Sequence, residues 1–317
     1  MKQIQEVAQQ LRTQISKVIV GQEAAIDQML VALFAGGHVL LQGVPGVAKT
    51  LSAKTLAYLI KSSFKRIQFT PDLMPSDIIG TRVFDLSKSQ FYTQKGPIFA
   101  NIILADEINR APSKTQSALL EAMEERQVTI EGETFTFEEP FMILATQNPI
   151  EFEGTYGLPE AQLDRFMLKI LIEYPQEQDE LTILKRYNEG FTASKFAHYY
   201  QLEPILEPEQ IVSMRETIQQ IKVHEGILQY INQIVRSTRN NQNLFMGSSP
   251  RGGIALLLTS KTYAALQGRD YVTPDDVKQM ALPVLRHRII LRPEAEIDGL
   301  KPDEVLQEII QNTQVPR

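Results

Sequence analysis

The stretch that decides the fold is Gly43-Val44-Pro45-Gly46-Val47-Ala48-Lys49-Thr50. It follows a short, mostly apolar run at 38–41 and precedes a helical pattern at 51–57. A glycine-rich turn that ends in Lys-Thr between a strand and a helix is typical of a phosphate-binding loop. The backbone N–H groups of such a loop point at a polyphosphate, and the N-terminus of the following helix adds a favourable dipole. An ordinary strand-to-helix turn is the alternative, which the flanking elements disfavour.

Two side chains of this loop have specific roles in that interpretation. Lys49 would reach the outer phosphates, and the Thr50 hydroxyl would hold a magnesium ion. Ala48 departs from the usual pattern, because a glycine normally precedes the lysine. We expect alanine to fit, since it is the smallest substitute and a residue that enters a helix does not need a positive φ. The candidate nucleotide-binding residues here are Val44, Pro45, Gly46, Val47, Ala48, Lys49, Thr50 and Leu51.

Length and composition limit the classes of protein to which the chain can belong. Its 317 residues favour two domains, and 43% hydrophobic with 22% charged residues is ordinary for a globular protein with a full core. With a net charge of -6, the protein has no overall positive field that would attract nucleic acid. The net charge does not exclude a local basic patch. The chain has no cysteine, which excludes disulfides and thiol catalysis and is compatible with a reducing cytoplasm. We expect a cytoplasmic protein with no membrane span.

A second motif lies at the end of a buried strand. Residues 101–105 form a nearly continuous apolar run that ends in Asp106 and Glu107, as in a strand buried on both faces of a parallel sheet. Open α/β sheets bind ligands at the carboxyl ends of their strands. Asp106 would bind magnesium through its water shell, and Glu107 would polarise a water for attack on the γ-phosphate. A surface Asp-Glu pair is an equal alternative until the motif is combined with the upstream loop.

Two later segments complete the predicted sheet. The strand at 141–146 is followed by Asn148, which could orient the attacking water, although an Asn-Pro turn is the ordinary interpretation. A short helix from Leu158 leads to a last strand at 167–172. Strands alternating with helices predict a doubly wound, five-stranded parallel sheet with right-handed crossovers. Arg165 precedes the last strand, at the end of the sheet away from its own phosphate loop, so it would serve a neighbouring subunit's nucleotide.

The other segments are inserts and helices. A long irregular stretch at 70–97 and the segment 128–137 each contain a hairpin signal. From residue 179 onward helical patterns dominate and predict a separate all-helical domain. Arg251 opens one of these helices and is either a phosphate ligand or a solvated side chain. The break at Val20-Gly21, upstream of the first strand, could lie against adenine.

Together these motifs resemble AAA+ ATPases and, more narrowly, the MoxR family of the helix-2-insert clade. The resemblance covers nearly the whole chain. It implies that Lys49 and Thr50 are the Walker A lysine and magnesium ligand, Asp106 and Glu107 the Walker B pair, and Asn148 sensor 1. It further implies an arginine finger at Arg165, acting across a subunit interface, and sensor 2 at Arg251, in its own or the next subunit. Arg110 would also reach across an interface. The motifs that carry the resemblance are 43–50, 106–112, 116–125, 146–149, 158–166 and 249–251.

The same resemblance implies an organisation and a working form. The ATPase core would span 1–175, with an insert hairpin at about 70–97 and a pre-sensor-1 hairpin at about 128–137. A linker and connecting helix would follow at 176–205, and a helical lid at 206–317. ATP or ADP with Mg²⁺ would be the cofactors. The family implies a ring, usually a hexamer, that remodels protein clients as a chaperone does, in some cases with a von Willebrand A-domain partner.

Three alternatives belong to other functional classes. A nucleic-acid remodeller is disfavoured because the tip Glu131-Gly132-Glu133 is acidic and the other hairpin tip carries only Lys88, whereas gripping DNA requires cations. A non-hydrolysing scaffold would not need Glu107, Asn148 and Arg165. A simple phosphate-loop kinase does not account for the helical domain after the sheet.

Overall fold

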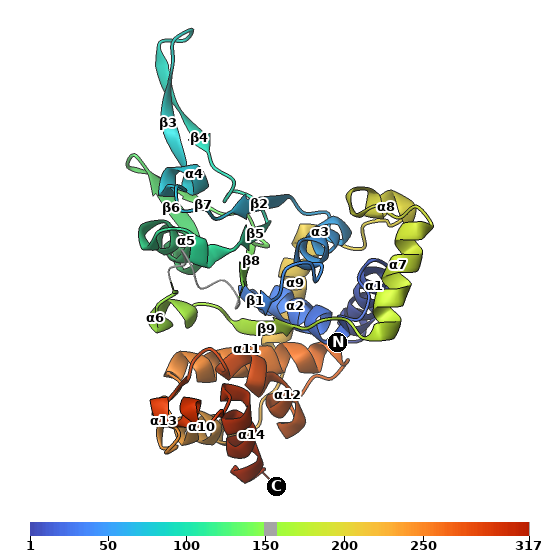
Figure 1. Cartoon of the computed structure of the whole chain (residues 1–317), viewed down its shortest axis with the longest axis vertical. Helices are drawn as coiled ribbons and strands as arrows, with labels where there is room; N and C mark the ends of the chain where they lie inside the picture. The colour runs from blue at the N-terminus through green and yellow to red at the C-terminus, as the bar shows by residue number, and fades with distance from the viewer. Residues whose placement is uncertain (149–156, 317) are drawn as a thin grey trace.

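The computed structural model describes residues 1–148 and 157–316 (Figure 1). Its centre is a five-stranded, all-parallel sheet in the order β2-β5-β8-β1-β9, which confirms the predicted doubly wound sheet. Each crossover between these strands contains helical segments, as parallel pairing requires. The strands are β1 (Val39–Gly43), β2 (Phe64–Gln68), β5 (Ile102–Asp106), β8 (Met142–Gln147) and β9 (Leu168–Ile172).

Alternating side chains of the central strands supply the two faces of the sheet. Ile102 and Leu104 of β5 belong to one buried cluster, whereas Ile103 and Ala105 belong to the other. The first cluster includes apolar residues of α1 (Lys2–Val18), α2 (Glu23–Ala35) and α3 (Lys49–Leu59). The second includes those of α5 (Ser113–Glu125). Because both faces are covered, the central strands consist almost entirely of apolar residues until they reach their polar carboxyl ends.

Two hairpins extend from the core on the same side of the molecule (Figure 1). After α4 (Pro75–Ile79), strands β3 (Gly80–Asp85) and β4 (Gln90–Lys95) pair antiparallel, and so do β6 (Gln127–Ile130) and β7 (Glu133–Thr136). Both hairpin predictions are therefore confirmed.

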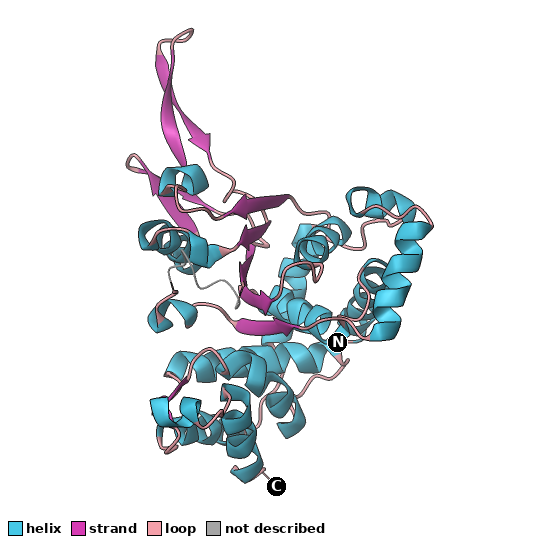
Figure 2. Ribbon diagram, viewed as in Figure 1, coloured by secondary structure: helices cyan, strands magenta, loops and turns pink. Residues whose placement is uncertain are grey.

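The chain after the sheet is mainly helical, as expected, but it contains a short antiparallel pair that the sequence did not predict (Figure 2). These strands are β10 (Leu244–Met246) and β11 (Ile290–Leu291), too short to show a period-two pattern. The Thr273 hydroxyl accepts from the backbone N–H of Asp276 and caps the helix that begins at Pro274. The helices are α6 (Glu160–Leu163), α7 (Glu177–Asn188), α8 (Phe196–Tyr199), α9 (Pro208–Gln219), α10 (Glu225–Arg239), α11 (Pro250–Leu266), α12 (Pro274–Leu285), α13 (Pro293–Ile297) and α14 (Pro302–Asn312), with 3-10 turns at Ile108–Arg110 and Ala193–Lys195.

The helical part packs closely on the core. Helix α11 contacts α1 and α2, α12 contacts β9, and α9 contacts both α2 and α11. Since α9 lies against helices of both parts, the proposed boundaries at 175 and 205 stay a prediction. Among the residues that the structure describes, no helix is long and apolar enough to cross a membrane.

Candidate functional site

A cleft of about 570 Å³ lies over the carboxyl edge of the sheet. Its lining includes the predicted phosphate loop together with Asp106, Glu107, Thr146 and Asn148. The segment before α2, side chains of α7 and residues that follow α7 also line the cleft. The structure thus brings the loop, both acidic residues and Asn148 into one cavity. The lining residues from the loop and the segment before α2 are Pro45, Gly46, Val47, Ala48, Lys49, Thr50, Leu51, Val18, Ile19, Val20 and Gln22.

Two predicted nucleotide contacts, Val44 and Gly21, do not line this cleft. Val44 packs against the hydrophobic core. Gly21 has a φ of 71°, and a Cβ placed on it would lie 2.6 Å from the Asp179 carboxylate of α7. The glycine therefore allows the chain to turn and α7 to approach closely, while its neighbour Val20 lines the cleft.

The loop backbone differs from the expectation at Ala48. Its φ is 61° and its ψ is 19°, in the left-handed region, so the prediction that this residue needs no positive φ is wrong. The chain turns through Ala48 before the first residue of α3, Lys49, and the left-handed conformation costs a residue with a Cβ about 1–2 kcal/mol. Gly46 is also left-handed, at 87°. The Lys49 ammonium donates to the Gly43 carbonyl at 2.7 Å and closes the loop.

Asp106 lies at the carboxyl end of β5, half-buried between the neighbouring strands β2 and β8. Its Oδ1 accepts a hydrogen bond of 2.6 Å from the Thr146 hydroxyl of β8. Its Oδ2 accepts from the Arg66 guanidinium of β2, at 2.6 Å from Nη2 and 3.0 Å from Nε. The neighbouring strands therefore fix the carboxylate on both sides, and one of its two oxygens is paired with a cation.

Glu107 has its own set of contacts. Its Oε2 accepts from Gln68 Nε2 and from Arg110 Nη1, both at 2.8 Å, and its backbone N–H donates to the Thr146 hydroxyl at 2.8 Å. Its φ of 57° places the residue in the left-handed region, a conformation that costs energy and is concentrated at functional sites. Arg110 thus contacts Glu107 within the chain, and its predicted role across an interface stays a prediction.

The donor set of the cleft fits magnesium. Thr50 and Asp106 supply a hydroxyl and a carboxylate, the hard oxygen ligands that Mg²⁺ prefers. Within residues 1–148 and 157–316, no group of three or more His, Cys, Asp or Glu side chains could enclose a metal by itself. Magnesium differs from metals that need such a cage, because it usually keeps several waters and binds substrate phosphates.

Arg165 and Arg251 lie outside the cleft and line a second cavity. Arg165 follows α6, and α6 and α7 lie on opposite sides of the molecule (Figure 1). Both arginines pair with Glu124 of α5: Arg165 Nε lies 3.0 Å from Oε2, and Arg251 Nη2 lies 2.9 Å from Oε1. The structure therefore brings the two candidate trans-acting arginines together and separates them from the phosphate loop of their own chain.

Sequence reasoning missed several residues of both cavities. Arg66, Gln68 and Thr146 contact the acidic pair, and the β2–β5 register places Gln68 directly beside Asp106. The polar residues at the end of β2 were a usable signal, but only if the order of the strands had been known. Glu124 and Asp164 lie within the motifs 116–125 and 158–166 that carry the resemblance, but the resemblance assigned neither of them a role.

Comparisons with known proteins agree with this architecture. Residues 38–168 match the model of the ATPase family associated with various cellular activities (AAA), and residues 236–309 match the AAA lid domain. The chain is 45% identical over 302 residues to the uncharacterized protein YeaC of Bacillus subtilis, covering 95% of this chain and 92% of that protein. It is 44% identical over 313 residues to chaperone MoxR1 of Mycobacterium tuberculosis, covering 96% and 81%. The chain belongs to the MoxR family of AAA+ ATPases.

A solved structure extends the MoxR-family assignment to the spatial arrangement. A crystal structure from Cytophaga hutchinsonii, described as that of a candidate ATPase, superposes with a TM-score of 0.91 at 42% identity. The match covers 99% of this chain and 96% of that one. The MoxR-family core and lid therefore have the same relative arrangement over almost the whole chain.

Proposed function

We propose that this MoxR-family protein hydrolyses ATP to ADP and phosphate with Mg²⁺. The observation that carries the proposal is the meeting of Lys49, Thr50, Asp106 and Glu107 in one cleft at the carboxyl edge of the sheet. Lys49 binds the outer phosphates, while Thr50 and Asp106 hold the magnesium ion, which neutralises charge on the phosphates when bound. To act, Glu107 exchanges its contacts with Gln68 and Arg110 for a water, which it orients and from which it accepts a proton. Asn148 is buried at the next strand end and helps to orient that water.

Hydrolysis is completed in an oligomer. Arg165 and Arg251 do not line their own cleft, so their charges stabilise the transferring phosphoryl group of a neighbouring copy. Arginine fingers of this kind accelerate hydrolysis by about 10³–10⁵-fold. A contact between two different faces of the chain repeats around a ring, and a hexamer is the form we propose.

We propose a chaperone-like action on protein clients, among them proteins with a von Willebrand A-domain. A relative that is 44% identical is named a chaperone. The β3–β4 hairpin supports a protein client over nucleic acid, because it exposes Phe84, Leu86, Phe91 and Tyr92. Arg82 lies over the Phe91 ring, 5.2 Å from its centroid. DNA that stimulates ATP turnover, with stimulation that falls steeply as salt rises, would instead support a nucleic-acid remodeller.

The test of hydrolysis is steady-state ATP turnover measured over a range of protein concentrations without any acceptor substrate. The rate per subunit is expected to rise with concentration and reach a plateau. Glu107→Gln should bind ATP with the affinity of the wild type and lose most turnover. Arg165→Ala should remove the rise with concentration while leaving ATP binding to the dilute protein intact. Normal turnover of Glu107→Gln would exclude Glu107 from the reaction, and an unchanged plateau of Arg165→Ala would exclude the trans arginine.

A further inference from the structure

Glu124 holds both candidate trans-acting arginines on a single carboxylate. It lies in the last turn of α5, and each of its oxygens accepts from a different guanidinium, at 3.0 Å from Arg165 and 2.9 Å from Arg251. The two guanidinium groups are like charges, and their mutual repulsion is offset by the carboxylate that both of them contact. All three side chains are partly exposed, at 37% for Glu124, 29% for Arg165 and 44% for Arg251, so an incoming group can reach them.

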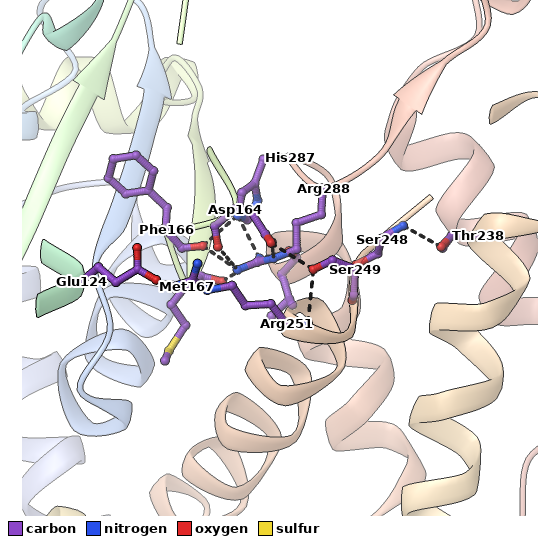
Figure 3. Close-up of polar contacts among 11 residues, drawn as sticks. Glu124, Asp164, Phe166, Met167, Thr238, Ser248, Ser249, Arg251, His287 and Arg288 are labelled. Atoms are coloured by element: carbon purple, nitrogen blue, oxygen red, sulfur yellow. Dashed lines mark hydrogen bonds and ion pairs between the residues drawn. The ribbon is translucent and has the colours of Figure 1, made fainter. Parts of the chain in front are cut away.

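The segments that carry the two arginines are also connected, by a hydrogen bond between the side chains of Asp164 and Ser249 (Figure 3). Asp164, the residue before Arg165, accepts from the Ser249 hydroxyl at 2.9 Å. Ser249 is the N-cap of α11 and accepts from the backbone N–H of Arg251 at 3.2 Å. One hydrogen bond therefore connects the turn that carries Arg165 to the helix start that carries Arg251.

Arg288 fixes the same turn from the lid side. Its Nε donates to Asp164 Oδ1 at 2.7 Å, and its Nη2 donates to the carbonyls of Phe166 at 2.7 Å and Asp164 at 3.2 Å (Figure 3). Its side chain is only 2% exposed. Burial lowers the pKa of Arg288 to about 10, and Asp164 opposes that shift, so Arg288 is charged at neutral pH. Because its donors are directed at Asp164 and Phe166, Arg288 fixes the turn that carries Arg165. Arg165 and Arg251 themselves stay near the surface.

We propose that Glu124 is a positioning residue that presents Arg165 and Arg251 as a preformed pair to the triphosphate of a neighbouring copy. The inference rests on the proposed ATPase function. Guanidinium groups match carboxylates and phosphates with similar geometry, so the carboxylate keeps the arginines spaced as a phosphate group would need them. In the assembled protein the more highly charged phosphate takes over both guanidiniums from Glu124. No bond to phosphorus involves Glu124; it orders two long side chains before the phosphate arrives.

The test compares Glu124→Gln with the wild type at the plateau of ATP turnover against protein concentration. Glutamine removes the charge and keeps only one acceptor oxygen, so it cannot hold both guanidiniums. Immobilising one long side chain costs about 0.5–1.5 kcal/mol, which predicts a plateau rate about 2- to 13-fold lower for each arginine that is no longer ordered. The KM for ATP and the affinity of the dilute protein for ADP should stay unchanged, because Glu124 does not line the cleft. Glu124→Asp keeps the charge on a shorter side chain and should fall between the two.

Two controls separate the outcomes. Glu125→Gln changes the next exposed residue of α5 and should keep the wild-type rate. In an Arg165→Ala, Arg251→Ala background, Glu124→Gln should cause no further loss, since no arginines remain to be ordered. An unchanged or higher rate for Glu124→Gln, or a full further loss in the arginine-free background, would overturn the role of Glu124 while leaving the ATPase function intact. A wild type without concentration-dependent turnover would overturn both.

Discussion

Lowering the pH from 7 to 5 should destabilise the folded protein through His38, which precedes β1. The imidazole is buried, its Nδ1 accepts from the backbone N–H of Ile143 at 3.0 Å, and its Nε2 lies 3.2 Å from the Met123 carbonyl. With Nδ1 as the acceptor, the neutral ring donates from Nε2. Burial lowers the pKa of His38 to about 3, with a further contribution from the positive charge of Arg126.

The sign and size of the effect follow from proton binding. The folded imidazole stays neutral between pH 7 and 5 because its pKa lies well below this range, whereas the unfolded chain takes up a proton below the ordinary pKa of 6.5. The unfolded state therefore binds more protons, and the free energy of unfolding falls by about 2 kcal/mol from pH 7 to pH 5 for His38. Burial lowers the pKa of His287 well below its ordinary value as well, so His287 should contribute a similar fall over the same range.

The assay is equilibrium unfolding in urea at pH 7, 6 and 5. We expect the free energy of unfolding to fall across the series, and His38→Gln, although less stable at pH 7, to lose about 2 kcal/mol of that pH dependence. His198→Gln, which changes an exposed histidine, should leave the pH dependence unchanged. Equal stability of the wild type at pH 7 and 5, or the same slope for His38→Gln as for the wild type, would refute a neutral, buried His38.

Three further variants test other contacts. Ala48→Gly should change the free energy of unfolding by less than about 1 kcal/mol, because relief of the left-handed strain is offset by the greater entropy of unfolded glycine; a large loss in thermal unfolding would contradict that balance. Arg66→Ala should lower the Mg²⁺ concentration for half-maximal ATP turnover by about two- to fivefold, since a partly exposed cation no longer competes for Asp106; a higher requirement would show that Arg66 assists metal binding. Arg288→Met should cost about 1–3 kcal/mol, because the half-buried Asp164 carboxylate and the Phe166 carbonyl lose their charged donor, and an unchanged melting temperature would contradict this.

The candidate nucleotide site at the carboxyl edge of the sheet was predictable because its residues directly follow individual strands in the sequence. In parallel strands the carboxyl ends lie at one edge, so a loop after one strand and acids after another must meet. That rule placed Asp106, Glu107 and Asn148 beside Lys49 before the structure was known. It did not place Arg66, because the rule specifies which end of a strand faces the ligand but not which strands are neighbours.

The remaining differences have local or tertiary causes. The left-handed φ of Ala48 depends on the direction from which the loop enters α3. An alanine in the sequence does not predict a positive φ, because residues with a Cβ rarely adopt one. The β10–β11 pair depends on a contact between segments more than forty residues apart. Glu124 is one of several acidic residues on α5. It differs from the others because it contacts two arginines, Arg165 from the turn before β9 and Arg251 from the start of α11. Such convergence is a property of the packed molecule rather than of any segment.

The connection between core and lid determines how the arginines can move. Asp164 bonds to Ser249 and Arg288, and α12 packs on β9, so the turn before β9 and the start of α11 form one body. A displacement of the lid that kept these contacts would carry Arg165 and Arg251 together. A displacement that separated Asp164 from Arg288 would leave the Arg288 guanidinium buried without its counter-charge, which is energetically costly. In the proposed ring, a movement of one copy's lid would therefore move Arg165 and Arg251 together relative to the phosphates bound by the neighbouring copy. Glu124 preserves their mutual spacing during that movement, which is why we assign it to positioning rather than to the reaction itself.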